Sequence, residues 1–223
     1  MYLGIDIGTS GVKAVLVDGA QNIVDQAVVP LTVQRPKPLW SEQNPADWWE
    51  ASTAAVKGLD AFKRSGVKAI GLSGQMHGAV CLGANDKVLR PAILWNDGRS
   101  GAQCGQMMAD MPELTSITGN LAMPGFTAPK LAWMREHEAD IFANTAKVLL
   151  PKDYVRLCLS GDYVSDMSDA SGTLWLDVAN RKWSPELLAT TGLSTDHMPS
   201  LVEGSQKSTM LRAALCARWG MKE

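Results

Sequence analysis

The first thirty residues alternate between short apolar segments and tight polar breaks. Apolar residues gather at 3–5, 12–17 and 23–29, and the breaks at 8–11 and 18–22 contain Gly, Ser, Thr, Asp and Asn. Short apolar segments bounded by such turn residues are typical of β-strands. Three of them in succession predict an antiparallel meander.

A helical pattern follows a Pro-containing loop. Asn44 suits an N-cap and Pro45 suits the first helical turn. Apolar side chains then recur at helical spacing, which predicts an amphipathic helix that ends at Gly66. These apolar positions are Trp48, Ala51, Ala55, Leu59 and Phe62.

Two further apolar segments, at 67–72 and 79–82, are expected to add strands to the same sheet. The order strand, strand, strand, helix, strand differs from a regular alternation of strand and helix. A sheet built in this order must contain both antiparallel and parallel neighbours. The sequence therefore predicts an α/β fold with a mixed sheet.

Beyond residue 98 the pattern becomes mainly helical. Helices are expected at about 99–110, 129–138, 152–159 and 185–190, separated by Pro and Gly. We expect one domain over residues 1–223, with a sheet core mainly in 1–97 and an inserted helical region mainly in 98–223. No repeat or long linker divides the chain.

Composition narrows the choice of partners. The 223 residues are 46% hydrophobic, enough for a sizeable core, and carry a formal net charge of -2. Lys and Arg form no run that could neutralise a row of phosphates, which argues against nucleic acid. No stretch is apolar enough for a membrane span, and the N-terminus lacks a signal-peptide pattern, so we expect no membrane partner and a cytoplasmic location.

The four cysteines are far apart in sequence and form no C-x-x-C pair. No His lies near enough in sequence to complete a zinc set. We therefore expect buried free thiols in a reducing compartment. These residues are Cys81, Cys104, Cys158 and Cys216.

The first candidate site is the turn after the first strand. Gly8 leaves room for a phosphate, while Thr9 and Ser10 offer hydroxyl and backbone donors. Asp6 could hold Mg²⁺ through its waters, and Lys13 could add a positive charge nearby. The alternative is an ordinary hairpin with Gly and Ser in its turn.

The second candidate site is the segment 73–78, where a buried strand ends between two glycines. Ligands bind at strand ends in open sheets. Gln75 and His77 can exchange hydrogen bonds with sugar hydroxyls, and Met76 offers an apolar wall for a carbon face. The alternative is a loop histidine whose ring is satisfied by the backbone.

The third candidate site is the segment 94–99. Trp95 could stack on a sugar face, and Asp97 could accept hydrogen bonds from hydroxyls. The alternative makes Trp95 a core residue and Asp97 the N-cap of the helix near Arg99. Elsewhere, Lys130 is expected to have a structural role.

Asp166 and Asp169 could form a paired acid site. Solvated or helix-capping carboxylates are the commoner outcome for such a pair.

Taken together, these motifs resemble the FGGY carbohydrate kinase family in their content and order. The resemblance covers nearly the whole chain and implies an actin-like ATPase fold of the ribonuclease H type, with ATP and Mg²⁺ as cofactors. It rests on residues 6–13, 75–78, 95–99, 125–133, 150–154 and 168–173.

Within that family, the Gln-Met-His-Gly form is similar to xylulokinases, whereas glycerol kinases carry Arg-Glu in place of Met76 and His77. The likeness implies transfer of the ATP γ-phosphoryl group to D-xylulose, giving D-xylulose 5-phosphate. It places Met76 and His77 at the ketopentose, with Asp97 nearby. The 6–13 turn would then face the ATP phosphates and Mg²⁺.

The sequence departs from the family in one respect. The family's catalytic Asp belongs to a Gly-Gly-Asp-Asn type motif that opens a second domain, and no such segment occurs before Glu223. We therefore expect the sugar-binding N-terminal half of a longer kinase, nearly inactive alone, with its own C-terminal domain as partner.

Three other functions stay open at this point. They are a kinase of another ketopentose or pentitol, an actin-like nucleotide-binding module without a sugar, and a non-catalytic sugar-binding domain. The eight tryptophans leave room for an exposed aromatic interface, so a homodimer is open as well.

Overall fold

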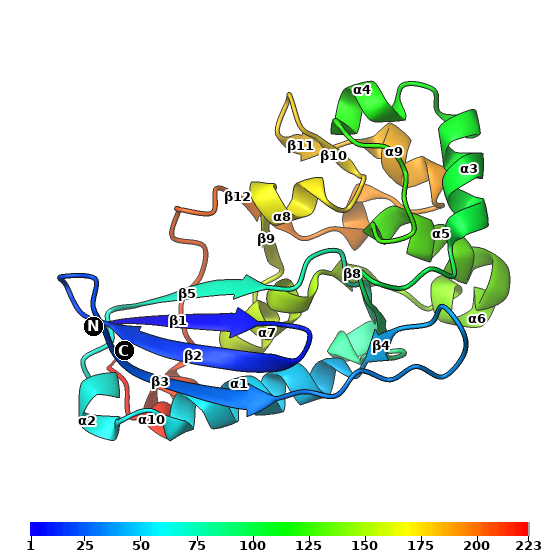
Figure 1. Ribbon diagram of the computed structural model, residues 1–223. Coiled ribbons are helices and arrows are strands. Elements are labelled where there is room, and N and C mark those ends of the chain that lie inside the picture. The colour runs from blue at the N-terminus through cyan, green and yellow to red at the C-terminus, as the bar shows by residue number, and fades with distance from the viewer. Residues whose placement is uncertain (223) are drawn as a thin grey trace.

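A four-stranded mixed sheet forms one side of the molecule (Figure 1). The computed structural model describes residues 1–222. β1 (Tyr2–Ile7), β2 (Gly11–Val17) and β3 (Ile23–Pro30) form an antiparallel meander, and β5 (Ala69–Gly74) pairs in parallel with β1. The strand order is β3-β2-β1-β5. The predicted meander and mixed sheet are confirmed.

The helix after Asn44 is shorter than predicted. α1 (Pro45–Gly58) begins as expected, because the Asn44 side chain accepts from the Ala46 N–H. It ends eight residues before Gly66, so the predicted end is wrong. Asp60 caps a separate helix, α2 (Ala61–Arg64). The Arg64 guanidinium closes the end of α1, because it donates to the carbonyls of Val56 and Lys57 in the last turn and to that of the C-cap residue Leu59.

The segment 79–82 does not join the main sheet, contrary to prediction. β6 (Val80–Leu82) pairs antiparallel with β8 (Lys147–Leu149) in a sheet of its own. The chain changes direction at His77, whose φ of 64° lies in the left-handed region. Gly78 then packs closely on Pro151, where an added Cβ would lie 2.6 Å from the ring Cγ.

Three other short strand pairs complete the sheet structure. They are β4 (Glu42–Gln43) with β7 (Ala92–Ile93), β9 (Val164–Asp166) with β12 (Ser200–Val202), and β10 (Leu176–Asp177) with β11 (Lys182–Trp183).

The four helices predicted after residue 98 are present. Pro and Gly end several of them as expected. The α-helices of this region are α3 (Gly101–Asp110), α4 (Leu114–Thr118), α5 (Thr127–His137), α6 (Ala139–Ala143), α7 (Pro151–Ser160), α8 (Met167–Ser171), α9 (Pro185–Thr190) and α10 (Ala213–Trp219). One 3₁₀ turn, η1 (Ala84–Asp86), lies before this region and another, η2 (Thr195–His197), lies within it.

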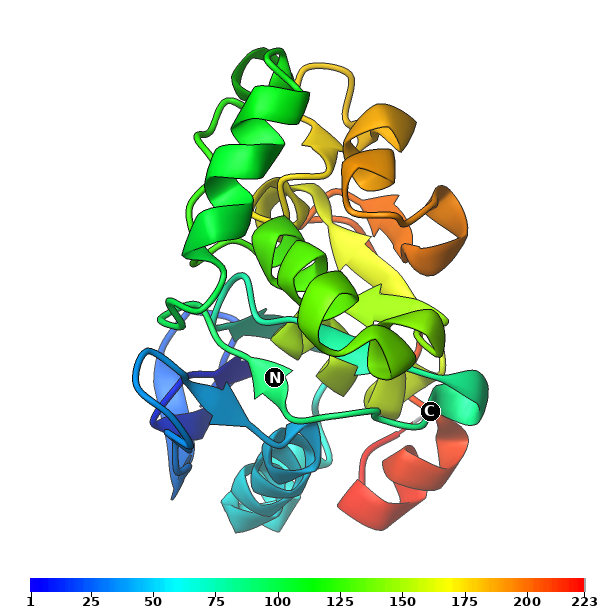
Figure 2. The ribbon, with the colours of Figure 1, turned by 90° about the vertical axis from the view of Figure 1, so that its right-hand side faces the viewer.

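Two hydrophobic clusters build the interior. The first joins the sheet and α1 to α7 and to α10, so residues from both ends of the chain share one core. Figure 2 shows α1 and α10 together at the base of the molecule. The second cluster lies among α3, α5 and α9. These helices and the segments around them form the upper part of the molecule in Figure 1, called the upper lobe below.

The four cysteines are free thiols, as predicted, and Cys81, Cys104 and Cys216 are buried. Cys158 is only half-buried, so the prediction of burial is wrong for that residue. Among residues 1–222, no helix has both the length and the apolar character needed to cross a membrane.

Candidate functional site

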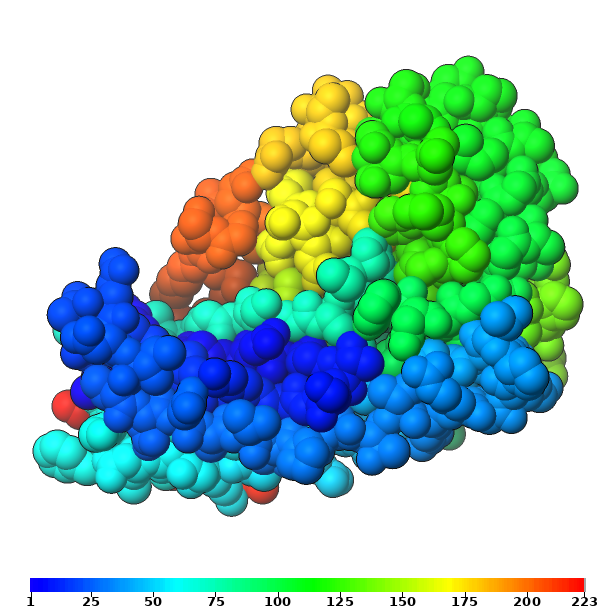
Figure 3. All heavy atoms as spheres, viewed as in Figure 1, coloured from blue at the N-terminus to red at the C-terminus, as the bar shows by residue number. Residues whose placement is uncertain are grey.

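A large cleft lies between the main sheet and the upper lobe. Its volume is about 1350 Å³, and it runs from the 74–78 loop along β5 to the segment 202–211. Figure 3 shows the hollow between β5, in cyan, and this segment, in orange. Met76, His77, Phe126 and Asp169 line it. The second sequence motif therefore faces this large cleft.

His77 is held so that one ring nitrogen remains open. Nδ1 lies 2.6 Å from the carbonyl oxygen of Gly172, and the ring packs edge-on against Phe126 with the ring centres 4.6 Å apart. A carbonyl only accepts hydrogen bonds, so Nδ1 carries the proton. Nε2 is then a free acceptor. The adjacent Met76 is 47% exposed and adds an apolar surface.

The surroundings of His77 favour a neutral ring. Burial lowers the pKa of His77 below its usual value of 6.5, and the nearby Lys130 charge lowers it further, while the hydrogen bond to Gly172 opposes both. At pH 7 the imidazole is therefore uncharged. It can accept a hydrogen bond from a hydroxyl at Nε2.

Lys130 fixes the backbone on the other side of His77. Its Nζ donates to the carbonyls of His77 at 3.0 Å and Phe126 at 3.1 Å, and also to the carbonyl of Gly125. Thr127 donates to the same His77 carbonyl. Burial lowers the pKa of Lys130 to about 7. The structural role predicted for Lys130 agrees with these contacts.

The three sequence motifs meet at the Thr9 hydroxyl. Thr9 Oγ1 donates to Gln75 Oε1 at 3.1 Å and accepts from Trp95 Nε1 at 3.0 Å. Gln75 Nε2 donates to Gln43 Oε1 at 2.9 Å, and Gln43 Nε2 donates to the Thr9 carbonyl at 2.8 Å. The amide of Gln75 is thus bound to protein partners at both ends. It bridges the first and second motifs in this structure, and its predicted contact with a sugar stays a prediction.

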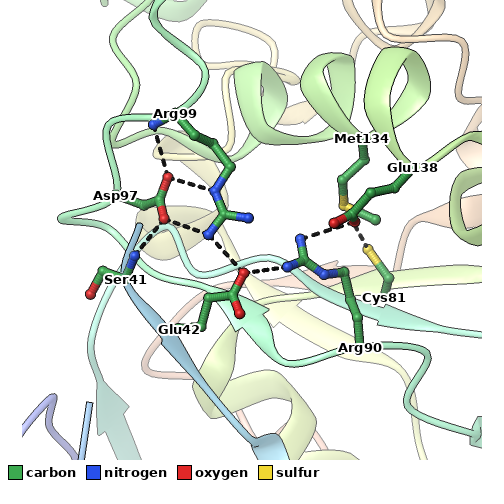
Figure 4. Close-up of polar contacts among 8 residues, drawn as sticks. All are labelled: Ser41, Glu42, Cys81, Arg90, Asp97, Arg99, Met134 and Glu138. Carbon is green, nitrogen blue, oxygen red and sulfur yellow. Dashed lines mark hydrogen bonds and ion pairs between the residues drawn. The ribbon is translucent and has the colours of Figure 1, made fainter. Parts of the chain in front are cut away.

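Asp97 is enclosed by protein donors (Figure 4). Its side chain accepts from the Ser41 N–H at 2.6 Å and from the Arg99 N–H and Nε, each at 2.9 Å. The Arg99 guanidinium also pairs with Glu42 at 2.7 Å, and Glu42 pairs with Arg90. The alternative role as an N-cap is wrong, since Ser100 occupies the cap of α3. The contact of Asp97 with a sugar stays a prediction, and in this structure its side chain is only 1% exposed.

The first motif presents three polar groups to solvent. Asp6 and Lys13 lie directly opposite each other on β1 and β2, and both are exposed, as is Ser10. The Gly8 N–H is used inside the turn, where it donates to the Gly11 carbonyl at 3.0 Å, and the room that Gly8 leaves for a phosphate stays a prediction. The side chains of this motif that are open to solvent are therefore Asp6, Ser10 and Lys13.

Asp6 fits an Mg²⁺ ion that keeps most of its waters. Within residues 1–222 the structure has no cluster of three or more His, Cys, Asp or Glu that could enclose a metal. A single exposed carboxylate is typical of Mg²⁺ bound together with substrate phosphates.

A buried charge cluster forms one wall of the cleft. Lys152 Nζ lies 2.6 Å from Asp153 Oδ1 and 2.9 Å from both Asp166 Oδ2 and Asp169 Oδ2. Asp166 also caps α8 by accepting from the Asp169 N–H. The two carboxylates do lie together, but around a lysine that neutralises part of their charge.

The pKa values of Asp166 and Asp169 are shifted in opposite directions by their surroundings. Burial raises the pKa of Asp169 to about 6, because the attraction of Lys152 only partly offsets burial and the repulsion of Asp153 and Asp166. For Asp166, burial is outweighed by Lys152, and the pKa is lowered. Burial alone would lower the pKa of Lys152, but the surrounding carboxylates raise it.

Three residues of the site were not singled out from the sequence. Gln43 and Gly172 act through contacts with segments far away in the chain, at Thr9 and His77. Lys152 was noted only as the start of a helix. The segments 150–154 and 168–173 carried the family resemblance, which was the one available signal for the last two.

Known proteins resemble this chain in sequence and in fold. The whole chain, residues 1–223, matches the N-terminal domain of the FGGY family of carbohydrate kinases. A xylulose kinase of Escherichia coli K12 is 54% identical over 222 residues, which cover 99% of this chain and 46% of that protein. The chain thus spans about half the length of the curated relatives it matches.

Solved structures of carbohydrate kinases also resemble this chain in fold. A crystal structure of a xyloylose kinase from Brucella ovis has a TM-score of 0.98 and 56% identity, covering all of this chain and 46% of that one. A xylulose kinase from Rhodospirillum rubrum has a TM-score of 0.93 and 28% identity, covering 99% and 47%. The expected actin-like ATPase fold is confirmed. The chain therefore belongs to the FGGY family of carbohydrate kinases, as its N-terminal domain.

Proposed function

We propose that this chain is the sugar-binding N-terminal half of an ATP-dependent xylulokinase that converts D-xylulose to D-xylulose 5-phosphate. The observation that carries the proposal is the open Nε2 of a neutral His77, beside Met76, on the wall of the large cleft. Relatives at 54% and 53% identity are named xylulose kinases.

The residues of the chain divide the work between sugar and phosphate. His77 accepts a hydrogen bond from a sugar hydroxyl at Nε2, and Met76 lies against the carbon skeleton of the sugar. Asp6, Ser10 and Lys13 face the phosphates of ATP. Mg²⁺ held near Asp6 would neutralise phosphate charge during transfer. Fixed donors and acceptors of this kind accelerate phosphoryl transfer by positioning rather than by covalent chemistry.

The remaining parts of the reaction belong to a second domain of the longer protein. That domain would contribute the carboxylate that accepts the hydroxyl proton and most of the adenosine contacts. Closure of two domains over the sugar would exclude water and limit ATP hydrolysis. The present chain alone is expected to turn over almost no substrate.

The test is coupled ADP release by the longer protein with D-xylulose, D-ribulose, L-ribulose, xylitol and glycerol. We expect strong preference for D-xylulose and a large loss of kcat/KM in His77→Ala. His137→Ala is the matched control, because His137 is 51% exposed and lies outside the cleft. Equal turnover of all five compounds, or none, would overturn the proposal.

A further inference from the structure

The position of the His77 ring depends on the short helix α8. Gly172 directly follows α8, and its carbonyl holds Nδ1 of His77 at 2.6 Å. The approach is so close that a Cβ added to Gly172 would lie 2.6 Å from the same nitrogen. Any movement of the C-terminal end of α8 therefore moves the acceptor that fixes the proton on Nδ1.

α8 has only five residues, Met167–Ser171, and a helix this short is not stable by itself. Its first turn is held by Lys152. The ammonium contacts Asp166, which caps the helix, and Asp169, which lies in the first turn. The side chain of Lys152 is 5% exposed, so water weakens these contacts little.

The same turn of α7 supports the loop that carries His77. An added Cβ at Gly74 would lie 3.4 Å from Lys152 Cβ, and one at Gly78 would lie 2.6 Å from Pro151 Cγ. Pro151 and Lys152 are the first two residues of α7, and they therefore contact the loop on both sides of His77. Lys152 thus joins the loop of His77 to the helix that holds its ring.

We infer that Lys152 is a positioning residue for the sugar site: through Asp166 and Asp169 it holds α8 where the Gly172 carbonyl keeps the proton of His77 on Nδ1. Nε2 is then left as the acceptor for a hydroxyl of a polyhydroxylated ligand. This inference rests on the proposed function for the identity of that ligand. Lys152 itself acts through His77.

The test uses two variants and two readouts. Lys152→Met removes the cation, and Asp169→Leu removes one contact while Lys152 keeps Asp153 and Asp166. Lys182→Met, at an exposed position outside the cleft, is the matched control. The first readout is the tautomer of His77 in the present chain, from long-range ¹H–¹⁵N correlation, with His77→Ala used for assignment. The second is steady-state kinetics of the longer protein.

We expect wild type and Lys182→Met to carry the proton on Nδ1. Both cluster variants should show a shift toward Nε2–H or a mixture. In the kinetics we expect KM for D-xylulose to rise about tenfold in Lys152→Met and about threefold in Asp169→Leu, or roughly 1.4 and 0.7 kcal/mol. KM for ATP should stay within about twofold, a split that general destabilisation would not produce.

Each outcome decides one question. If Lys152→Met does not fold, Asp169→Leu carries the test. If the folded variants keep the Nδ1 tautomer and the wild-type KM for D-xylulose, the positioning role is overturned. If the wild-type longer protein phosphorylates no sugar, the proposed function fails, and the tautomer alone decides whether Lys152 positions His77.

Discussion

Two buried lysines support the loop of His77, one directly and one through α8, and their surroundings differ in charge. Lys130 donates to backbone carbonyls only, including that of His77. Lys152 lies among three carboxylates and acts on the ring side, through α8. Burial lowers the pKa of Lys130 to about 7, whereas the carboxylates raise the pKa of Lys152. Near pH 7 Lys130 is thus only partly protonated, whereas Lys152 is protonated, because their hydrogen-bond acceptors differ.

The difference shows what each kind of partner can do. Neutral carbonyls satisfy the hydrogen bonds of an ammonium but repay only part of the cost of burying its charge. Carboxylates offset that cost by their attraction to the ammonium. Because they are buried themselves, they in turn need the cation as a partner. Lys130 is therefore suited to pinning a backbone, and Lys152 to holding separate elements together.

The largest effect is expected from Lys152→Met. The substitution leaves Asp153, with a fully buried side chain, without its cation, and Asp166 and Asp169 lose the same partner. We expect the free energy of unfolding to fall by about 3–5 kcal/mol, as for other broken buried pairs. Urea denaturation of the chain measures it, with Lys182→Met as control. A loss below about 1 kcal/mol would contradict the comparison.

Lys130→Met should change how stability depends on pH. The unfolded lysine titrates near 10.5 and the folded one at about 7. Between these values the unfolded state binds more protons, so the unfolding free energy of the wild type rises with pH. From pH 7 to 9 we expect a gain of about 2 kcal/mol relative to Lys130→Met.

The measurement is a set of urea denaturations of both proteins between pH 7 and pH 9. The difference between the two proteins removes the contributions of other titrating groups. Parallel pH profiles would show that Lys130 keeps its full charge in the folded state.

Asp169→Asn should reveal the opposite trend at acidic pH. Asp169 titrates at about 6 when folded and near 3.8 when unfolded, and it faces Lys152, Asp153 and Asp166. Its raised pKa stabilises the fold fully below about 3.8, and this contribution is lost as pH rises to 6. Relative to Asp169→Asn, we expect the wild type to lose about 2 kcal/mol between pH 4 and 6. Thermal or urea unfolding across this range measures it, and a constant difference would refute it.

The smallest effect is expected from Gly172→Ala, which disturbs the ring of His77 but neither lysine. The new methyl group overlaps the imidazole, and we expect a loss at the low end of overpacking costs, about 1 kcal/mol. Gly105→Ala is the control, because Gly105 lies in α3 with nothing within 4 Å of an added Cβ. That control should gain about 0.5–1 kcal/mol. Equal effects at the two glycines would mean that His77 yields freely.

Much of the fold could be predicted because its signals are local. The meander follows from short apolar segments and the turns between them, and α1 starts at Asn44 because a cap needs only neighbouring residues. The family motifs also identified the loop of Met76 and His77, which does line the cleft. Local pattern failed where a distant partner decides. β8 lies far along the chain from β6, and it takes β6 out of the main sheet. The early end of α1 is a different case, because Arg64 closes it from only five to eight residues away and the apolar pattern does not reveal this local contact.

The sequence by itself determined which side chains have the right chemistry for a ligand, and among them Asp6 and Lys13 are exposed while Met76 and His77 line the cleft. Only the tertiary structure decided which of the other candidates are free to act. Thr9, Gln75 and Asp97 have the right chemistry for a ligand, yet each is bound by protein groups far away in sequence. The physical reason is that buried polar atoms must be paired, and the pairing depends on which distant segments the fold brings together.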